Sequence, residues 1–286
     1  MNPPQTTPNG RFRKRTGHVV SPCFSQSSPV LHAATYPAPT SNAPPLLILH
    51  GFLGSGGNWH TLARRWAQTR PVVVPDARNH GRSFHTDAFG YAEMTDDLAA
   101  LLDAQNVERI DLLGHSMGGK TAMRFAVEHP HRVRRLVVAD ISPFASPAQF
   151  APYLDAMAAV DLATVTDRDA VEEALVSAVP SWGVRQFLLK NLVRTREGFR
   201  WALNLPVLRA VWQDVGDAVD LHGSFDGPTL FVRGANSPYV TDADWPLVQT
   251  RFPNAVLSTI PEAGHWLHAE QPDAFFETVE AFLAAP

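Results

Sequence analysis

The sequence predicts an α/β fold in which helices cover both faces of a mostly parallel central sheet. Two observations predict it. Short continuous apolar runs, typical of strands that are buried on both faces, alternate along the chain with segments of helical apolar spacing. Apolar residues make up 45% of the 286 residues and charged residues 18%, which suffices for a substantial core and differs from the composition of disordered chains.

Six apolar runs are predicted as strands, because each is short and is bounded by turn or polar residues. The first ends at Gly51, and the second contains three consecutive valines before Asp76. In chain order the predicted strands cover 46–50, 71–75, 110–113, 135–140, 229–233 and 255–260. The predicted helices, whose apolar residues recur every three to four positions, cover 92–103, 120–127 and 273–283.

The strand pattern stops between residues 144 and 227, where helical patterns are interrupted by prolines. We therefore expect a helical cap, or lid, at 144–227, inserted into an α/β core of 29–143 and 228–286. The aromatic residues of this insertion fit either a packed bundle or an apolar binding surface.

The first 28 residues contain four prolines, a basic cluster and no acidic residue, and they show no hydrophobic periodicity. We expect a flexible N-terminal extension, with a basic transit peptide as the alternative. The default location is therefore the cytoplasm, and the mitochondrial matrix is the alternative if the extension is cleaved. The single cysteine, Cys23, excludes an internal disulfide framework.

The charge balance is close to neutral: 24 Lys and Arg against 28 Asp and Glu give a net charge of −4. Such a balance does not indicate nucleic acid or an anionic membrane as a partner. The apolar runs are far shorter than the roughly 20 residues that span a bilayer, so no stable membrane insertion is expected. A small-molecule substrate is the expected partner, and the oligomeric state is not indicated.

Residues 114–118 (Gly-His-Ser-Met-Gly) fit the pattern G-x-S-x-G between a predicted strand and a predicted helix. In this context the glycines allow a tight, strained turn that leaves the hydroxyl of Ser116 free above the sheet. The N–H of Met117 and the positive end of the following helix would face a developing oxyanion. The pattern therefore indicates a nucleophilic serine.

The same segment, read as Gly114 to Thr121, also fits the phosphate-binding pattern G-x-x-x-x-G-K-[ST]. Residues 136–140 are similar to the apolar strand that ends in a magnesium-binding aspartate in nucleotide hydrolases. A P-loop nucleotide hydrolase is therefore the rival hypothesis. It leaves unexplained two further segments that an acyl hydrolase requires.

The first of these segments is 50–54 (His-Gly-Phe-Leu-Gly), where the backbone N–H of Phe52 is the candidate second donor of an oxyanion hole; an ordinary glycine-rich turn is the alternative. The second is 263–266 (Ala-Gly-His-Trp), after the last predicted strand. His265 stands where the general base of a Ser, acid, His chain order is expected. His268 is a weaker competitor.

The strings HGFLGSGGNW, DARNHGRS, GHSMGGKTA, VVADISP, PTLFVRGANS and AGHWLH resemble the α/β-hydrolase superfamily. Several of them are similar to the YbfF-like esterase subfamily, which includes mitochondrial α/β-hydrolase-domain proteins, and the resemblance runs from about Leu31 to the C-terminus. It implies an α/β-hydrolase fold, hydrolysis of esters and possible use of acyl-CoA. It also accounts for residues 118–121 without a nucleotide.

The resemblance also implies the third catalytic residue. Many superfamily members carry the acid three residues after the glycine of the strand at 230–234, where this chain has Ser237. Asp140, in a motif that resembles the subfamily's, is therefore assigned to orient His265, and Asp242 is the fallback. The polar residues Arg185, Asn191 and Asn204 match subfamily positions in the insertion, and the resemblance implies that they bind substrate.

Together these observations predict a serine hydrolase that cleaves carboxylic esters or thioesters with an apolar acyl chain, without a metal or an organic cofactor. The alternatives are the P-loop nucleotide hydrolase and a non-catalytic binding module with a hydrolase fold.

Overall fold

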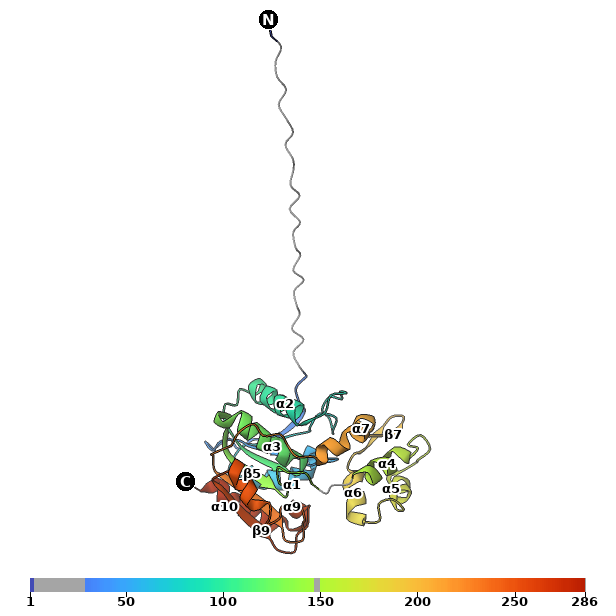
Figure 1. Ribbon diagram of the computed structural model, residues 1–286. Helices are drawn as coiled ribbons and strands as arrows, with labels where there is room; N and C mark the ends of the chain where they lie inside the picture. Colours follow the sequence, from blue (N-terminus) through green and yellow to red (C-terminus); the bar gives the residue numbers. More distant parts are fainter. Residues whose placement is uncertain (3–28, 147–149, 286) are drawn as a thin grey trace.

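The computed structural model describes residues 1–2, 29–146 and 150–285 (Figure 1). Most of the predicted N-terminal extension, including Cys23, lies outside the described residues.

A seven-stranded sheet forms the centre of the molecule, with the strand order β1-β3-β2-β4-β5-β8-β9. Six strands run parallel, and β1 pairs antiparallel with β3 at the edge, which confirms the prediction of a mostly parallel sheet. The strands are β1 (Ala33–Tyr36), β2 (Leu46–Leu49), β3 (Val72–Pro75), β4 (Ile110–His115), β5 (Val133–Ala139), β8 (Thr229–Gly234) and β9 (Ala255–Ile260).

Helices cover both faces of this sheet because successive strand residues point to opposite sides. On β2, Leu46 and Ile48 pack on one apolar cluster, and Leu47 and Leu49 on the other. Helices α1 (His60–Trp66), α9 (Leu267–Glu270) and α10 (Pro272–Ala284) supply the first cluster. Helices α2 (Tyr91–Ala104), α3 (Met117–Glu128) and α8 (Trp245–Arg251) supply the second. Two short 3₁₀ helices, η1 (Gly56–Trp59) and η2 (Pro130–Arg132), complete the core.

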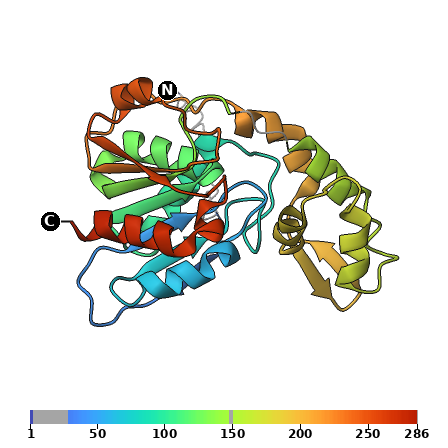
Figure 2. The ribbon, with the colours of Figure 1, turned by 90° about the horizontal axis from the view of Figure 1, so that it is seen from below.

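A second group of elements lies beside the sheet in both ribbon views, and we call it the cap (Figures 1 and 2). It consists of α4 (Ala151–Ala159), α5 (Arg168–Leu175), α6 (Trp182–Leu189), β6 (Leu192–Thr195), β7 (Gly198–Trp201) and α7 (Leu205–Gly216). The expectation that this part has no strands is wrong, because β6 and β7 form an antiparallel hairpin. Its two-residue turn ends at Gly198, whose φ of 130° suits glycine alone.

The chain leaves the core for the cap and returns from it at neighbouring points. The N–H of Ser146 donates to the carbonyl of Gly216 at 2.8 Å, and the N–H of Val219 donates to that of Pro143 at 2.9 Å. The ammonium of Lys120, on α3, donates to the same Gly216 carbonyl at 3.1 Å and to the carbonyl of Asp217. We call these contacts the hinge. They join the two connections of the cap to each other, and Lys120 joins the returning connection to the helix that follows Ser116.

None of the helices in the described ranges combines the length and the apolar character that crossing a bilayer requires.

Candidate active site

Ser116 occupies a sharp turn between the end of β4 and the start of α3. Its φ of 54° and ψ of −120° lie in a region that a non-glycine residue adopts only under strain. The turn is held because the N–H of Ser116 donates to the carbonyl of Ala139 at 3.1 Å and the N–H of Lys120 to that of Ser116 at 3.0 Å. These two hydrogen bonds hold the strained backbone conformation of Ser116, the residue predicted to be the nucleophile.

The two glycines that flank Ser116 are required by close backbone contacts. A Cβ atom at Gly114 would lie 2.2 Å from the carbonyl oxygen of Gly118, and one at Gly118 would lie 2.5 Å from that of Leu49. Helix α3 therefore packs against β4 and β2 at a distance that any side chain would prevent. This is the physical reason for the G-x-S-x-G spacing.

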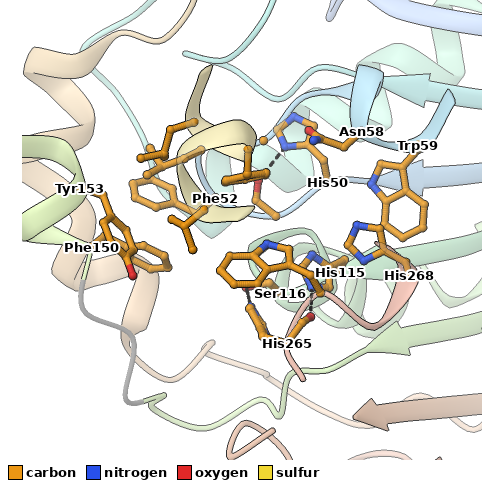
Figure 3. A pocket seen from close by; sticks show the side chains of 17 residues that line it. His50, Phe52, Asn58, Trp59, His115, Ser116, Phe150, Tyr153, His265 and His268 are labelled. Carbon is orange, nitrogen blue, oxygen red and sulfur yellow. Dashed lines mark hydrogen bonds between the residues drawn. The ribbon is translucent and has the colours of Figure 1, made fainter. Parts of the chain in front are cut away.

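His265 links Ser116 to Asp140. The Nδ1–H of His265 donates to Oδ2 of Asp140 at 2.8 Å, which leaves Nε2 to accept the hydroxyl of Ser116 at 3.1 Å (Figure 3 shows Ser116 beside His265). The three side chains follow β4, β5 and β9, whose carboxyl ends meet at one edge of the parallel sheet. This arrangement brings together the three residues that the sequence analysis assigned to catalysis.

Asp140 is fully buried, and its two oxygens accept hydrogen bonds from the last residue of β8 and from the loop that follows it. Oδ1 accepts the N–H of Gly234 at 2.9 Å, and Oδ2 accepts the hydroxyl of Ser237. Ser237 thus stands at the position where the superfamily resemblance expected an acid, and it donates to the acid on the neighbouring strand. The fallback, Asp242, is largely exposed and pairs with Arg233 at 2.7 Å.

Tyr239 is a residue of this site that the sequence analysis did not identify. Its ring stacks on the imidazole of His265 with centroids 3.9 Å apart and an interplanar angle of 19°. Burial and the charge of Asp140 raise the pKa of the Tyr239 phenol, so the ring stays neutral. No sequence motif marks this position, because the contact joins two loops that are distant in the chain.

The backbone N–H groups of Phe52 and Met117 are the expected oxyanion donors, and Phe52 lines the same pocket as Ser116. Phe52 is the second residue of a turn in which the N–H of Gly54 donates to the carbonyl of Gly51 at 3.0 Å, so the Phe52 N–H takes no part in that bond. Met117 begins α3, and the first N–H groups of a helix have no intrahelical acceptor. These are the two donors expected from the sequence.

Four buried histidines lie near the turn of Phe52 or the loop of His265. They are His50, His80, His115 and His268. Burial is the main cause that lowers the pKa of each imidazole, to about 3 for His80 and His268, so all four are neutral near pH 7. They therefore act here as hydrogen-bonding and packing groups without charge.

Two of these histidines, His115 and His268, pack close to the loop of His265. The Nε2–H of His115 donates to the backbone carbonyl of His265 at 2.8 Å. His268, the weaker competitor for the base, stacks on Trp59 with ring centroids 4.3 Å apart. His265 is thus the histidine that hydrogen-bonds to Ser116.

An apolar pocket of about 510 Å³, open mouth included, lies over Ser116 and is lined from both the core and the cap (Figure 3). Figure 3 shows Phe150 and Tyr153 from the cap on one side, and Trp59 and His268 from the core on the other. The remaining apolar lining residues are Phe52, Leu53, Val184, Phe187, Leu188 and Trp266. Such a lining suits a hydrocarbon chain.

The three polar residues expected to bind substrate do not line this pocket. Arg185 stays within the cap, where its guanidinium donates to the carbonyls of Val179 and Pro180. The side-chain amides of Asn191 and Asn204 bridge the cap to the core instead. The side chains of these three residues therefore hydrogen-bond to other residues of the protein, and none of them lines the pocket over Ser116.

The rival P-loop arrangement is absent from the described residues. Helix α3 begins at Met117, so Gly118 to Thr121 already belong to the helix and form no loop around a phosphate. Lys120 is buried at the hinge, where desolvation lowers its pKa from 10.5 to about 8. Among the residues that the structure covers, no group of three or more His, Cys, Asp or Glu is arranged to hold a metal ion.

Comparison with known proteins identifies the family to which the fold belongs. The sequence pattern of the alpha/beta hydrolase fold matches residues 44–272. The sn-1-specific diacylglycerol lipase ABHD11 of Danio rerio is 40% identical over 247 residues, which cover 84% of this chain and 78% of that protein. Esterase YbfF of Escherichia coli (strain K12) is 34% identical over 247 residues, covering 85% of this chain and 94% of that one. A solved structure described as a marine microorganism esterase superimposes with a TM-score of 0.85 at 36% identity and covers 89% of this chain and 100% of that chain.

Proposed function

The chain belongs to the alpha/beta hydrolase fold family and is an ester hydrolase, and we propose that it cleaves its ester through Ser116, His265 and Asp140. The observation that supports this proposal most is the continuous hydrogen-bonded path from the Ser116 hydroxyl through His265 to the buried Asp140. Such a path activates a serine that is otherwise a weak nucleophile at neutral pH.

In the first half of the reaction, Oγ of Ser116 attacks the acyl carbonyl carbon while Nε2 of His265 takes the hydroxyl proton. The carbonyl oxygen becomes an oxyanion that the N–H groups of Phe52 and Met117 stabilise. The tetrahedral intermediate then expels the alcohol or thiol, which receives the proton from His265. This step leaves an acyl group on Ser116.

In the second half, water replaces the departed alcohol or thiol. His265 takes a proton from the water as the oxygen attacks the acyl carbon, and it returns that proton to Oγ of Ser116 as the carboxylic acid leaves. Asp140 keeps the imidazole in the tautomer with Nδ1 protonated and stabilises the imidazolium that forms in each half.

The acyl part of the substrate is an apolar chain, because the pocket over Ser116 is lined by aromatic and aliphatic side chains. Two classes of leaving group, an alcohol and a thiol, are compatible with this site. The relatives named diacylglycerol lipases suggest a neutral glycerolipid ester. The subfamily resemblance suggests an acyl-CoA thioester.

One feature favours the thioester of a phosphate-bearing thiol. A solvent-open cleft of about 930 Å³ is lined by Ser55, and the preceding residue, Gly54, lines the pocket over Ser116. Its basic lining residues are Arg82, Lys190 and Arg200. Asp76 also lines the cleft, but its carboxylate accepts the N–H groups of Gly56 and Arg82. Cations in this cleft would attract the phosphates of coenzyme A.

A fluorophosphonate probe tests the reaction type, because only an activated serine reacts readily with it. We expect labelling of the wild-type protein and none of Ser116→Ala, whose turnover of p-nitrophenyl esters should fall by several orders of magnitude. A chain-length series of these esters, run beside acyl-CoA and diacylglycerol, then identifies the substrate class. Labelling that persists in Ser116→Ala contradicts the proposal.

We propose the cytoplasm as the compartment, with the mitochondrial matrix as the alternative that the basic first 28 residues suggest. Cell fractionation distinguishes the two.

A further inference from the structure

The turn that carries the Phe52 N–H contains a strained residue. Leu53 has a φ of 59°, in the left-handed region that a leucine avoids, and its side chain is 1% exposed. A residue in this conformation persists only where its surroundings hold it. Phe52 and Leu53 are the two central residues of this turn, so relaxation of Leu53 would change the conformation of the turn that carries the Phe52 N–H.

From the core, His80 holds the N–H side of Leu53. The Nδ1–H of His80 donates to the carbonyl of Arg78 at 2.9 Å, which leaves Nε2 to accept the N–H of Leu53 at 3.3 Å. His80 is completely buried and neutral, so it remains an acceptor over the whole working range of pH.

From the cap, Asn191 holds the carbonyl side of the same residue. Its Nδ2 donates to the carbonyl of Leu53 at 2.8 Å and to that of Leu188, at the end of α6, at 3.2 Å. The backbone of Asn191 is fixed as well, because its carbonyl accepts the N–H of Ala202 after β7 at 2.8 Å. The side chain is 2% exposed, so water does not replace these bonds.

We propose that Asn191 is a positioning residue through which the cap holds the oxyanion turn, so that the Phe52 N–H is in place only while the cap is seated on the core. This inference rests on the proposed function. Asn191 does not touch the reacting atoms; it acts through Leu53. Because a displacement of about 1 Å in such a site costs up to about 100-fold in rate, one hydrogen bond at this place has a kinetic effect.

The test replaces Asn191 by Leu, which is similar in size and lacks the amide. For p-nitrophenyl butyrate we expect kcat to fall by about 10- to 100-fold while KM changes by less than about threefold, because the loss falls on the transition state. The matched control is Tyr91→Phe. It removes another single hydrogen bond between core and cap, from the Tyr91 hydroxyl to the carbonyl of Val215 at 2.6 Å, and it should leave kcat within about threefold.

A second readout separates positioning from mere stability. An alkylboronic acid forms a tetrahedral adduct with a catalytic serine, and one of its oxygens occupies the oxyanion hole. The inhibition constant of the boronic acid should rise in Asn191→Leu by about the factor by which kcat/KM falls. In Tyr91→Phe it should stay unchanged. The milder Asn191→Ser gives the same comparison if Asn191→Leu does not fold.

Normal kcat in folded Asn191→Leu overturns the inference, as does a lowered kcat with unchanged boronate affinity. An equal loss of kcat in Tyr91→Phe also overturns it, since loosening of the cap would then be the cause. Each of these results leaves the proposed function intact, because fluorophosphonate labelling of Ser116 tests that function independently.

Discussion

The hydroxyl of Ser237 donates a hydrogen bond to Oδ2 of Asp140, the same oxygen that accepts the Nδ1–H of His265. A carboxylate that follows β5 and a hydroxyl that follows β8 therefore meet at one point behind the imidazole. The side chain at the position where the superfamily resemblance expected an acid therefore donates to Asp140, the residue proposed as the acid. Asp140 thus contacts His265 although Ser237 is not an aspartate, as the proposed triad requires.

Replacing Asp140 by Asn should lower turnover on the order of 10⁴-fold, because an amide favours the wrong imidazole tautomer and cannot stabilise imidazolium. Steady-state kinetics with a p-nitrophenyl ester measure the effect. Asp242→Asn is the matched control: its carboxylate is exposed and pairs with Arg233, so turnover should be unchanged. The opposite pattern, near-normal Asp140→Asn and impaired Asp242→Asn, would transfer the role to Asp242.

Moving the acid from one strand to the other should be possible. Asp140→Ser alone should be nearly inactive, and adding Ser237→Asp should recover turnover by at least about tenfold, because the new carboxylate would reach the point that Oδ2 now occupies. The single variant Ser237→Asp is the control, and it should lose activity because it sets two carboxylates side by side. No recovery in the double variant would show that the two positions are not interchangeable.

Lys120 should matter for stability and little for chemistry. Lys120→Met keeps the length of the side chain and removes the ammonium that holds the hinge carbonyls, so kcat of the folded enzyme should stay within about threefold of wild type. The unfolding free energy should change with pH in a defined direction. The folded pKa is about 8 against 10.5 in the unfolded chain, so between these values the unfolded chain binds more protons.

Wild-type stability relative to Lys120→Met should therefore rise as the pH increases from about 8 to about 10.5, by up to about 3 kcal/mol. Urea unfolding at pH 7, 9 and 10.5 measures this difference. A difference that stays constant, or that falls with pH, would contradict the assignment of the shift to Lys120. If the wild-type protein consumes ATP and Lys120→Met does not, the result would instead favour a nucleotide hydrolase.

The six strands predicted from apolar runs are all present, because residues buried on both faces leave an uninterrupted signal in the sequence. The edge strand β1 was not predicted. Its sequence, Ala-Ala-Thr-Tyr, is mostly half-buried and gains its register only by pairing with β3. The hairpin β6–β7 was missed for a similar reason, since its residues alternate weakly in burial.

Ser116 and His265 could be predicted from short motifs that follow predicted strands, and Asp140 from the resemblance to the esterase subfamily. The partners of Lys120 and Asn191 could not. Lys120 contacts the chain 96 residues away, and Asn191 contacts it 138 residues away, and neither contact leaves a local pattern. Lys120 matches a phosphate-binding motif in the sequence, but in the fold its ammonium donates hydrogen bonds to the backbone carbonyls of the hinge.

The hinge has a consequence for how such enzymes diversify. Because Pro143 and Val219 are joined by a hydrogen bond, the two ends of the insertion emerge almost from a single point on the sheet. A segment of another length with equally close ends would therefore connect the same two points of the core. Such an exchange would also remove the hydrogen bond from Asn191 to Leu53, so a new segment would need its own contact to hold the turn that carries Phe52.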